Sequence, residues 1–155
     1  MCLYVKNPIN NNLFTSLFRR QHYKKCNPLV AKEDIICYKK YRILKDGETL
    51  TILSSPFLNM HVYVNNFPVH LDEIPYSDFI SIGYNKRNSV SNINFGYHSL
   101  LEKEDAINVM RGPYSTKYVV VKCMIPTGAL YYKGEFGFSE SFSSNKLILL
   151  EYAKR

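Results

Sequence analysis

A histidine at position 98 stands directly before a sequence that is typical of a helix start. The stretch Gly96–Met110 reads GYHSLLEKEDAINVM, in which Ser99 and Glu102 match the S-x-x-E capping box. Unpaired backbone N–H groups at such a start favour anions, so His98 would lie beside a phosphate or nucleotide site. Because the acidic residues of the same stretch would repel a phosphate, we favour an imidazole that hydrogen-bonds a backbone carbonyl and closes the turn.

A second chemistry is suggested by the order of histidine, tyrosine and glutamate along the chain. This order is that of the catalytic residues in ADP-ribosyltransferase-like enzymes, which use NAD, although the spacing here matches no motif of theirs. If the chain is such an enzyme, the catalytic candidates are His98, Tyr131, Tyr132 and Glu135, with Glu151 as a second choice of glutamate. The segments that define Ser/His/Asp hydrolases, P-loops and Rossmann folds are missing from the sequence. We therefore predict no catalytic residue and no cofactor, and keep the enzyme as the alternative.

Metal binding is not indicated either. The four cysteines are widely spaced and form no C-x-x-C pair, which argues against a zinc or thioredoxin-type motif. The nearest ligand pair is His22 with Cys26, and the two lysines between them would repel a cation. We predict no metal site and expect reduced thiols, of which Cys37 and Cys123 lie in apolar strand patterns and behave as small hydrophobic residues.

Positive charge is concentrated in the N-terminal third. The net charge is +7, and residues 1–46 hold ten of the 20 basic side chains but three of the 13 acidic ones, so the remainder is balanced. An anionic partner, whether a nucleotide, nucleic acid or acidic protein surface, would be attracted there first. The basic and aromatic residues that we predict to bind it are Arg19, Arg20, Tyr23, Lys24, Lys25, Lys39, Lys40, Tyr41 and Arg42.

Part of this basic segment has the pattern of an amphipathic helix. Leu13, Phe14, Leu17 and Phe18 share one helical face, and an asparagine precedes them as an N-cap. The helix either docks on a partner or nucleic acid, or covers one face of a sheet with its charges in water, and we favour the second reading.

The remainder of the chain predicts an α+β fold, a mostly antiparallel sheet of about seven or eight strands with two helices in a single domain. Residues 1–33 form the basic N-terminal helical segment and residues 34–155 the β-rich core. The Asp46-Gly47 pair is typical of a tight hairpin turn, and residues 85–92 resemble a mobile loop. The predicted strands are residues 34–44, 49–53, 61–64, 118–125, a strand or loop over 131–144, and a central strand over 146–152.

The sequence also bears on where the protein works. No apolar run approaches the ~20 residues needed to cross a bilayer, and the first residues lack the pattern of a secretory signal. We expect a soluble protein that needs no membrane. Whether it forms a homo-oligomer is left open.

Several segments, taken in order, resemble a group of small proteins encoded by bacteriophages and some large DNA viruses. They are CYKKYRIL, ILSSPF, GYHSLLEKEDA, YVVVKCMIPTGALYYKGEFG and SSNKLIL, which together extend over about residues 34–151. The resemblance implies a viral accessory protein of the host cytoplasm, a class that is often anti-defence. It leads us to expect a binding protein that inhibits a host defence protein, or sequesters a nucleotide or nucleic-acid ligand.

Overall fold

The computed structural model describes residues 3–6, 28–55, 60–79, 82–85, 90–93, 96–109 and 117–153. The helix predicted at residues 13–18 lies outside these ranges. The described elements, in chain order, are β1 (Leu3–Lys6), β2 (Leu29–Val30), β3 (Ile35–Lys45), β4 (Thr51–Ser54), β5 (His61–Val64), β6 (Val69–His70), α1 (Tyr76–Phe79), β7 (Ile82–Asn85), β8 (Val90–Ile93), β9 (Tyr97–Leu100), α2 (Lys103–Asn108), β10 (Tyr118–Ile125), β11 (Leu130–Phe136), β12 (Ser139–Ser144) and β13 (Ile148–Tyr152).

These strands form one sheet, and every pairing within the described part of the chain is antiparallel. The order along its main path is β6-β13-β10-β3-β9-β12-β11-β1-β8-β7, with β4 and β5 branching from β3 and β2 pairing with β11. The mostly antiparallel sheet and two small helices agree with the prediction, but thirteen strands exceed the seven or eight expected. Most of the additional strands have two to four residues, too few for a clear alternation of apolar and polar side chains.

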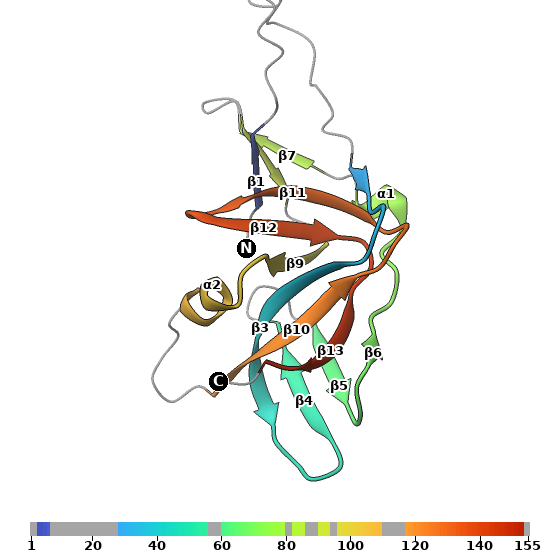
Figure 1. The fold of residues 1–155 in the computed structure, drawn as a ribbon, viewed down its shortest axis with the longest axis vertical. Coiled ribbons are helices and arrows are strands. Elements are labelled where there is room, and N and C mark those ends of the chain that lie inside the picture. Colours follow the sequence, from blue (N-terminus) through green and yellow to red (C-terminus); the bar gives the residue numbers. More distant parts are fainter. Residues whose placement is uncertain are drawn as a thin grey trace, which may run out of the picture.

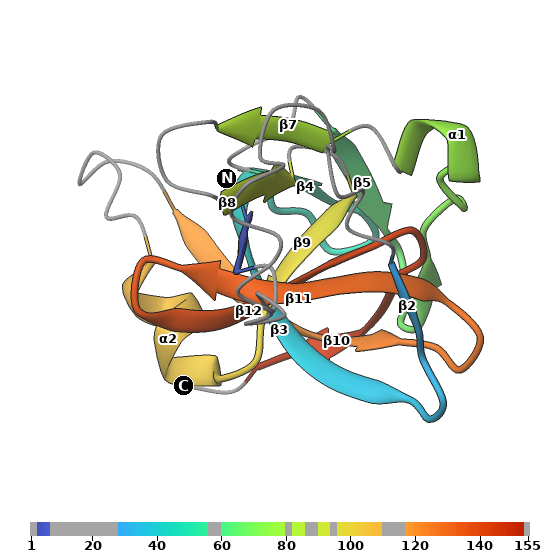
Figure 2. The ribbon, with the colours of Figure 1, turned by 90° about the horizontal axis from the view of Figure 1, so that it is seen from above.

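The sheet is strongly curved, and its branches enclose the core. In Figure 1, β3, β10 and β13 run side by side, while β11 and β12 cross above them and β9 lies between the two groups. The view from above shows α1 and α2 on opposite sides of the molecule, with α2 next to β3 and β9 (Figure 2). The predicted single sheet is therefore wrapped around its own apolar face.

The long β3–β10 pair supplies the centre of the core. Val119, Val121, Cys123 and Ile125 were predicted to point inward, and Val121, Cys123 and Ile125 are fully buried. Their partners on β3 include Cys37, which lies directly opposite Cys123 in the antiparallel register. Side chains of β4, β5, β12 and β13 complete the same apolar cluster. The alternation in the sequence thus identified the buried face correctly.

The stretch that contains His98 folds differently from the prediction. Residues Tyr97–Leu100 form β9, whose four side chains are buried and which pairs with β12 over its whole length. Helix α2 begins only at Lys103, its N-cap is Glu102, and no side chain caps it. The predicted capping box at Ser99 is therefore wrong, because strand pairing at Ser99 outweighs the local helix signal.

A close approach of two strands explains the glycine that precedes β9. Gly96 has a φ angle of +101°, and a Cβ atom there would collide with the Ser143 hydroxyl and lie 2.8 Å from the Phe79 ring. Phe79 is fully buried at the end of α1 and packs against Tyr132 with ring centroids 5.1 Å apart. Glycine is needed at position 96 for both its backbone angle and its missing side chain.

Two further predictions need correction. The last strand, β13, is not central, since its outer neighbour is the two-residue strand β6 at the edge of the main path. The segment predicted as a mobile loop contains β8 (Val90–Ile93), which pairs with β1 and β7. The partners β6 of β13 and β1 of β8 come from distant parts of the sequence.

Candidate ligand-binding groove and the buried lysine beneath it

Lys39 lies in the interior, although it was predicted to belong to an exposed basic surface. It follows Cys37 on the buried face of β3 and is only 4% exposed. Its Nζ atom donates a hydrogen bond of 2.6 Å to the backbone oxygen of His98. Strand β3 pairs with β9 at a single position, Tyr38 with Leu100, and then turns to β4, so the ammonium group supplies a donor where the two strands separate.

Burial alters the titration of this lysine. Removal from water disfavours the charged form and lowers its pKa from 10.5 to about 8, while the nearby Cys123 and Cys37 act in the opposite sense. The Nζ atom also lies 5.6 Å from the centroid of the Tyr41 ring, within the range of a cation–π contact. Lys39 is therefore a buried cation near neutral pH.

The two cysteines beside it are buried, free thiols. Burial raises the pKa of Cys37 to about 11, partly offset by a hydrogen bond with Ser99 and by the charge of Lys39. Burial also raises the pKa of Cys123 well above its usual value. The thiolate is the reactive form, so neither cysteine is suited to nucleophilic chemistry in the folded protein.

On the opposite face of β3, Lys40 fastens α2 to the sheet. Its Nζ atom donates to the carbonyl oxygens of Ile107 at 2.8 Å and Val109 at 2.9 Å, near the C-terminal end of the helix. The same Nζ lies 5.1 Å from the centroid of the Tyr118 ring. A cation is favourable at the carbonyl end of a helix, so this lysine has a structural role.

A groove of about 340 Å³ crosses this outer face, at the level of Lys122. Lys122 lies directly opposite Tyr38 of β3 and directly opposite Glu151 of β13. The residues that line the groove are Tyr38, Lys103, Lys122, Glu151, Tyr152 and Ala153. Three adjacent strands form its floor, and the first residue of α2 contributes to its wall.

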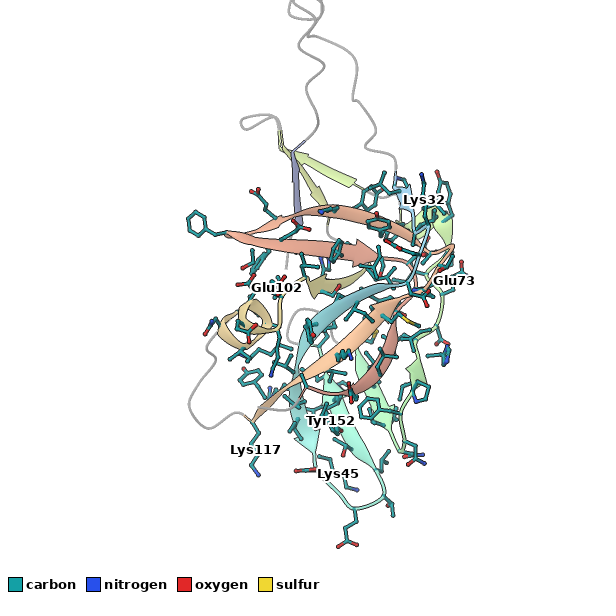
Figure 3. All side chains as sticks on the ribbon, viewed as in Figure 1. Lys32, Lys45, Glu73, Glu102, Lys117 and Tyr152 are labelled. Carbon is teal, nitrogen blue, oxygen red and sulfur yellow. The ribbon has the colours of Figure 1, made fainter. Side chains whose placement is uncertain are left out.

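The side chains of the groove are partly exposed and partly fixed. Lys122 forms an ion pair of 3.2 Å with Glu151, and both side chains reach solvent. Tyr152 is 38% exposed, and its ring meets the edge of Phe67 at a centroid distance of 4.9 Å. Tyr152 lies at the same end of the molecule as Lys117 and Lys45 (Figure 3). Tyr38 lies opposite Lys122 on the face of the groove, whereas Tyr152, which also contributes to the lining, lies opposite the buried Val121.

Of the predicted binding residues, the structure describes Lys39, Lys40, Tyr41 and Arg42. Tyr41 is fully buried, so neither it nor Lys39 can stack on or contact a ligand at the surface. Arg42 remains exposed, on the same face of β3 as Lys40. The remaining predicted residues lie outside the described residues, namely Arg19, Arg20, Tyr23, Lys24 and Lys25.

Two of the four enzyme candidates are brought into line, since His98 on β9 and Tyr132 on β11 both lie directly opposite Ser143 on β12. Tyr131 and Glu135, in contrast, lie on the other face of β11. Tyr132 is buried against Phe79, whereas Tyr131 packs against Phe142 with ring centroids 6.0 Å apart. Glu135 lies exposed toward the tip of the β11–β12 hairpin. His98 is 2% exposed and lines a cavity of about 10 Å³ to which the two tyrosines and Glu135 do not contribute.

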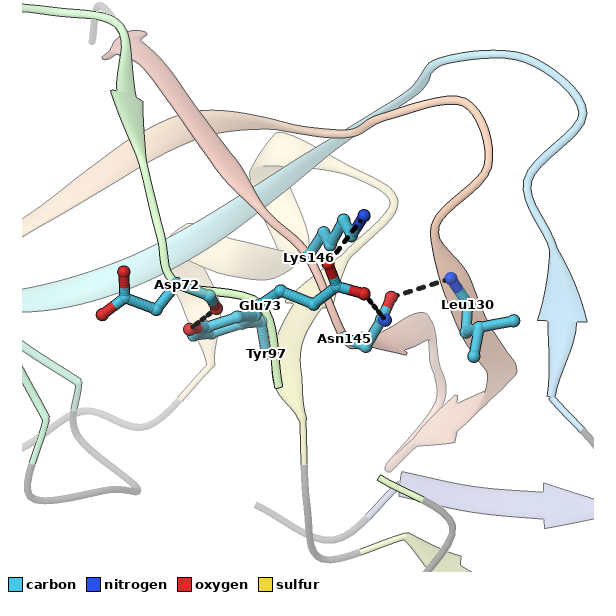
Figure 4. A network of polar contacts seen from close by, with 6 residues as sticks. All are labelled: Asp72, Glu73, Tyr97, Leu130, Asn145 and Lys146. Carbon is cyan, nitrogen blue, oxygen red and sulfur yellow. Dashed lines mark hydrogen bonds and ion pairs between the residues drawn. The ribbon is translucent and has the colours of Figure 1, made fainter. Parts of the chain in front are cut away.

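The SSNKLIL segment serves the fold. Asn145 accepts a hydrogen bond from the backbone N–H of Leu130 at 2.8 Å and donates one to Glu73 at 3.2 Å, and Glu73 also pairs with Lys146 at 2.9 Å (Figure 4). Beside this network, the hydroxyl of Tyr97 donates to the backbone oxygen of Asp72 at 2.6 Å. These bonds join the β6–α1 connection to β9, β11 and the start of β13.

The sequence did not identify Lys103, Lys122, Tyr152 or Ala153 as binding residues. Lys122 is the one charged residue within β10, whose other residues are apolar or aromatic. This contrast was a usable signal in the sequence. Its aromatic neighbours could not be found in the same way. Tyr38 meets it only through the register of β3 with β10, and Tyr152 enters the lining from β13.

Comparison of the chain with protein-family models, with curated proteins and with solved structures gave no match. Within the described ranges, no group of three or more His, Cys, Asp or Glu side chains could hold a metal ion. The helices described here include none with the length and apolar character needed to span a membrane.

Proposed function

We propose that this chain is a binding protein whose ligand is a nucleotide unit, either free or within a single-stranded nucleic acid. The observation that carries the proposal is the groove on the outer sheet face, where Tyr38 accompanies Lys103 and Lys122. Single-stranded nucleic acids are commonly bound by aromatic rings that stack on bases and by cations that contact phosphates.

Size and charge both support this ligand. A volume of about 340 Å³ falls within the range of small-molecule sites, and the groove holds two cations against the single carboxylate of Glu151. The ion pair between Lys122 and Glu151 is exposed to solvent and therefore weak. A phosphate group can replace Glu151 as the partner of Lys122 at little cost in free energy.

The proposed biological role follows the resemblance to viral accessory proteins. We infer that the protein withholds a nucleotide or a nucleic acid from a host defence protein in the infected cell. The excess of positive charge in residues 1–46 would increase the rate at which an anionic ligand is captured. The alternative, an NAD-dependent ADP-ribosyltransferase-like enzyme, stays a prediction.

The experiment is a binding titration with two probes, a labelled oligothymidine and a labelled ATP, each followed by fluorescence anisotropy. Replacement of Tyr38 by Ser removes one stacking platform and should weaken binding by roughly 5- to 150-fold, which corresponds to ~1–3 kcal/mol per stacked base. Lys122→Gln should weaken binding and reduce the salt dependence by about 0.7 in the logarithmic slope for a single strand.

The matched control is Lys133→Gln. Lys133 forms a comparable exposed ion pair with Glu140 on the β11–β12 hairpin, away from the groove, so its loss should leave binding unchanged. The two probes separate a free nucleotide from a strand as the ligand. If neither probe binds, or if binding is insensitive to both Tyr38→Ser and Lys122→Gln, the proposal is wrong.

The basic residues before residue 28 stay a prediction. Replacement of Arg19, Arg20, Lys24 and Lys25 by Ser should abolish binding of the same probes and leave the melting temperature almost unchanged. A large fall in melting temperature would instead show that these side chains stabilise the fold.

A further inference from the structure

Glu151 supplies the single carboxylate among the residues that line the groove on the outer sheet face. A groove that attracts phosphates gains nothing from a negative charge, because like charges repel. The side chain of Glu151 is 58% exposed, so its ion pair with Lys122 adds little to the stability of the fold. Neither phosphate binding nor stability therefore explains why this position of the groove holds a carboxylate.

A β-bulge in β13 turns Glu151 toward the groove. Between its pairs with Cys123 and Lys122 of β10, strand β13 contains one extra residue, Leu150. In a regular register Glu151 would lie opposite Val121, which points into the core. Bulges commonly re-aim a side chain next to a functional site. This bulge places a carboxylate acceptor on the outer face of the sheet.

Three side chains form a row across that face. Lys122 lies directly opposite Tyr38 on one side and directly opposite Glu151 on the other. Neighbouring strands are about 4.8 Å apart, so the two outer members of the row are about 10 Å apart at the backbone. A base that stacks on the ring of Tyr38 extends over Lys122 and turns its edge toward Glu151. A groove of about 340 Å³ accommodates a purine in this position.

The base edge that a carboxylate fits best is that of guanine. An ionised carboxylate only accepts hydrogen bonds, and its two oxygens match two donors that lie side by side. Guanine presents its N1–H and its 2-amino group side by side on the Watson–Crick edge. Adenine and cytosine present one amino group beside a ring nitrogen that is an acceptor, and uracil and thymine place a single N–H between two carbonyl oxygens. Each of these acceptors would repel the carboxylate.

We propose that the groove is specific for guanine nucleotides and that Glu151 determines this specificity, an inference that rests on the nucleotide-binding function proposed above. The base stacks on Tyr38, and its N1–H and 2-amino group donate to the two carboxylate oxygens of Glu151. The phosphates contact Lys122 and Lys103, which both line the groove. Lys122 thus exchanges Glu151 for a phosphate, while Glu151 exchanges Lys122 for the base.

The test is isothermal titration calorimetry of the full chain with GTP, ATP and inosine triphosphate, which share the ribose and the triphosphate. GTP should bind about tenfold more tightly than ATP. This is the lower end of the range for hydrogen bonds to a charged group, because water also reaches Glu151. Inosine triphosphate keeps the N1–H but lacks the 2-amino group, so its dissociation constant should lie between the other two.

The decisive variant is Glu151→Gln, and its readout is the ratio of the dissociation constants of ATP and GTP. Loss of the negative charge strengthens the binding of every triphosphate alike and leaves this ratio unchanged. The ratio should nevertheless fall to about one, because the amide of the variant turns donors toward the donors of guanine. Glu140→Gln is the matched control, since Glu140 forms an exposed ion pair with Lys133 away from the groove, and it should keep the wild-type ratio.

Equal affinity for the three nucleotides, or a preference for GTP that survives Glu151→Gln, would overturn this inference and leave the proposed nucleotide-binding function standing. Absence of binding by all three nucleotides would overturn both.

Discussion

The burial of Lys39 predicts an unusual pH dependence of stability. The pKa of its amine falls from 10.5 in the unfolded chain to about 8 in the folded protein, because the interior disfavours the charge. Below about pH 8 both states are protonated and the folded state carries the full penalty. As pH rises from about 8 to 10.5 the folded protein releases the proton first, so the contribution of Lys39 to stability improves through that window.

The size of this penalty follows from the shift. Each pKa unit corresponds to about 1.4 kcal/mol, so the shift of Lys39 corresponds to about 3 kcal/mol at neutral pH. Lys39→Met removes the penalty but also removes the hydrogen bond to His98, whose loss costs about 1–3 kcal/mol at every pH. The variant should therefore be as stable as the wild type or slightly more stable near pH 7. Between pH 7 and pH 10.5 its stability relative to the wild type should fall by about 3 kcal/mol, because the wild type loses its penalty.

Other buried groups titrate in the same range with the opposite sign. Burial raises the pKa of Cys37 from 9.0 to about 11, and it raises those of Cys123 and Tyr41 as well, so these three destabilise the fold as pH increases above about 9. The difference between wild type and Lys39→Met at each pH removes the contribution of Tyr41, and it contains the titration of Lys39 together with its electrostatic coupling to Cys37 and Cys123. The difference, and not the stability of either protein alone, is the quantity that reports on Lys39.

The assay is urea unfolding of both proteins at a series of pH values from about 7 to 10. The free-energy difference should change by roughly 1.4 kcal/mol per pH unit above the pKa of the folded state. A difference that stays constant across the series would refute the reasoning, because it would mean that the amine of Lys39 titrates alike in both states. Lys133→Met, at an exposed ion pair, provides the control with a flat difference.

Three further predictions concern the fold and its surface, and each is measured by thermal or urea unfolding. Gly96→Ala should destabilise by about 2–6 kcal/mol from backbone strain and overpacking, whereas Gly128→Ala, at a φ of +82° with open space around it, should cost only about 1–3 kcal/mol. Asn145→Ala should cost about 1–3 kcal/mol because the N–H of Leu130 loses its acceptor. Phe138→Ser should change stability by less than about 0.5 kcal/mol, since that side chain is fully exposed at the tip of the β11–β12 hairpin, and should lower self-association in light scattering. Equal losses at the two glycines, an unaffected Asn145→Ala or an unstable Phe138→Ser would each contradict the packing described above.

Local sequence patterns predicted much of the secondary structure. Strands β5 and β10 begin and end where the sequence places them, and β3 and β4 form the expected hairpin, although residues 46–50 connect them as a loop longer than the tight Asp46-Gly47 turn that was predicted. The reason is that alternation of apolar and polar residues is a property of neighbouring residues. Such a property can be read without knowledge of the fold.

The groove and the buried lysine depended on contacts between distant segments. Alternation along β3 already placed Lys39 among inward-facing residues, yet its burial became evident only with β9 and β12 in place. The S-x-x-E pattern at Ser99 predicted a helix, but pairing with β12 made this residue part of a strand.

By itself, the sequence determined which residues alternate in strands, where the chain turns, and that positive charge gathers near one end. The tertiary structure alone decided that Tyr38, Lys122 and Glu151 lie side by side, since three strands far apart in sequence had to adopt one register. It also decided that β3 leaves β9 after a single pair, which opens a cavity and places the charge of Lys39 beside it. Register and strand separation depend on the burial of a whole sheet, and no short stretch of sequence encodes that burial.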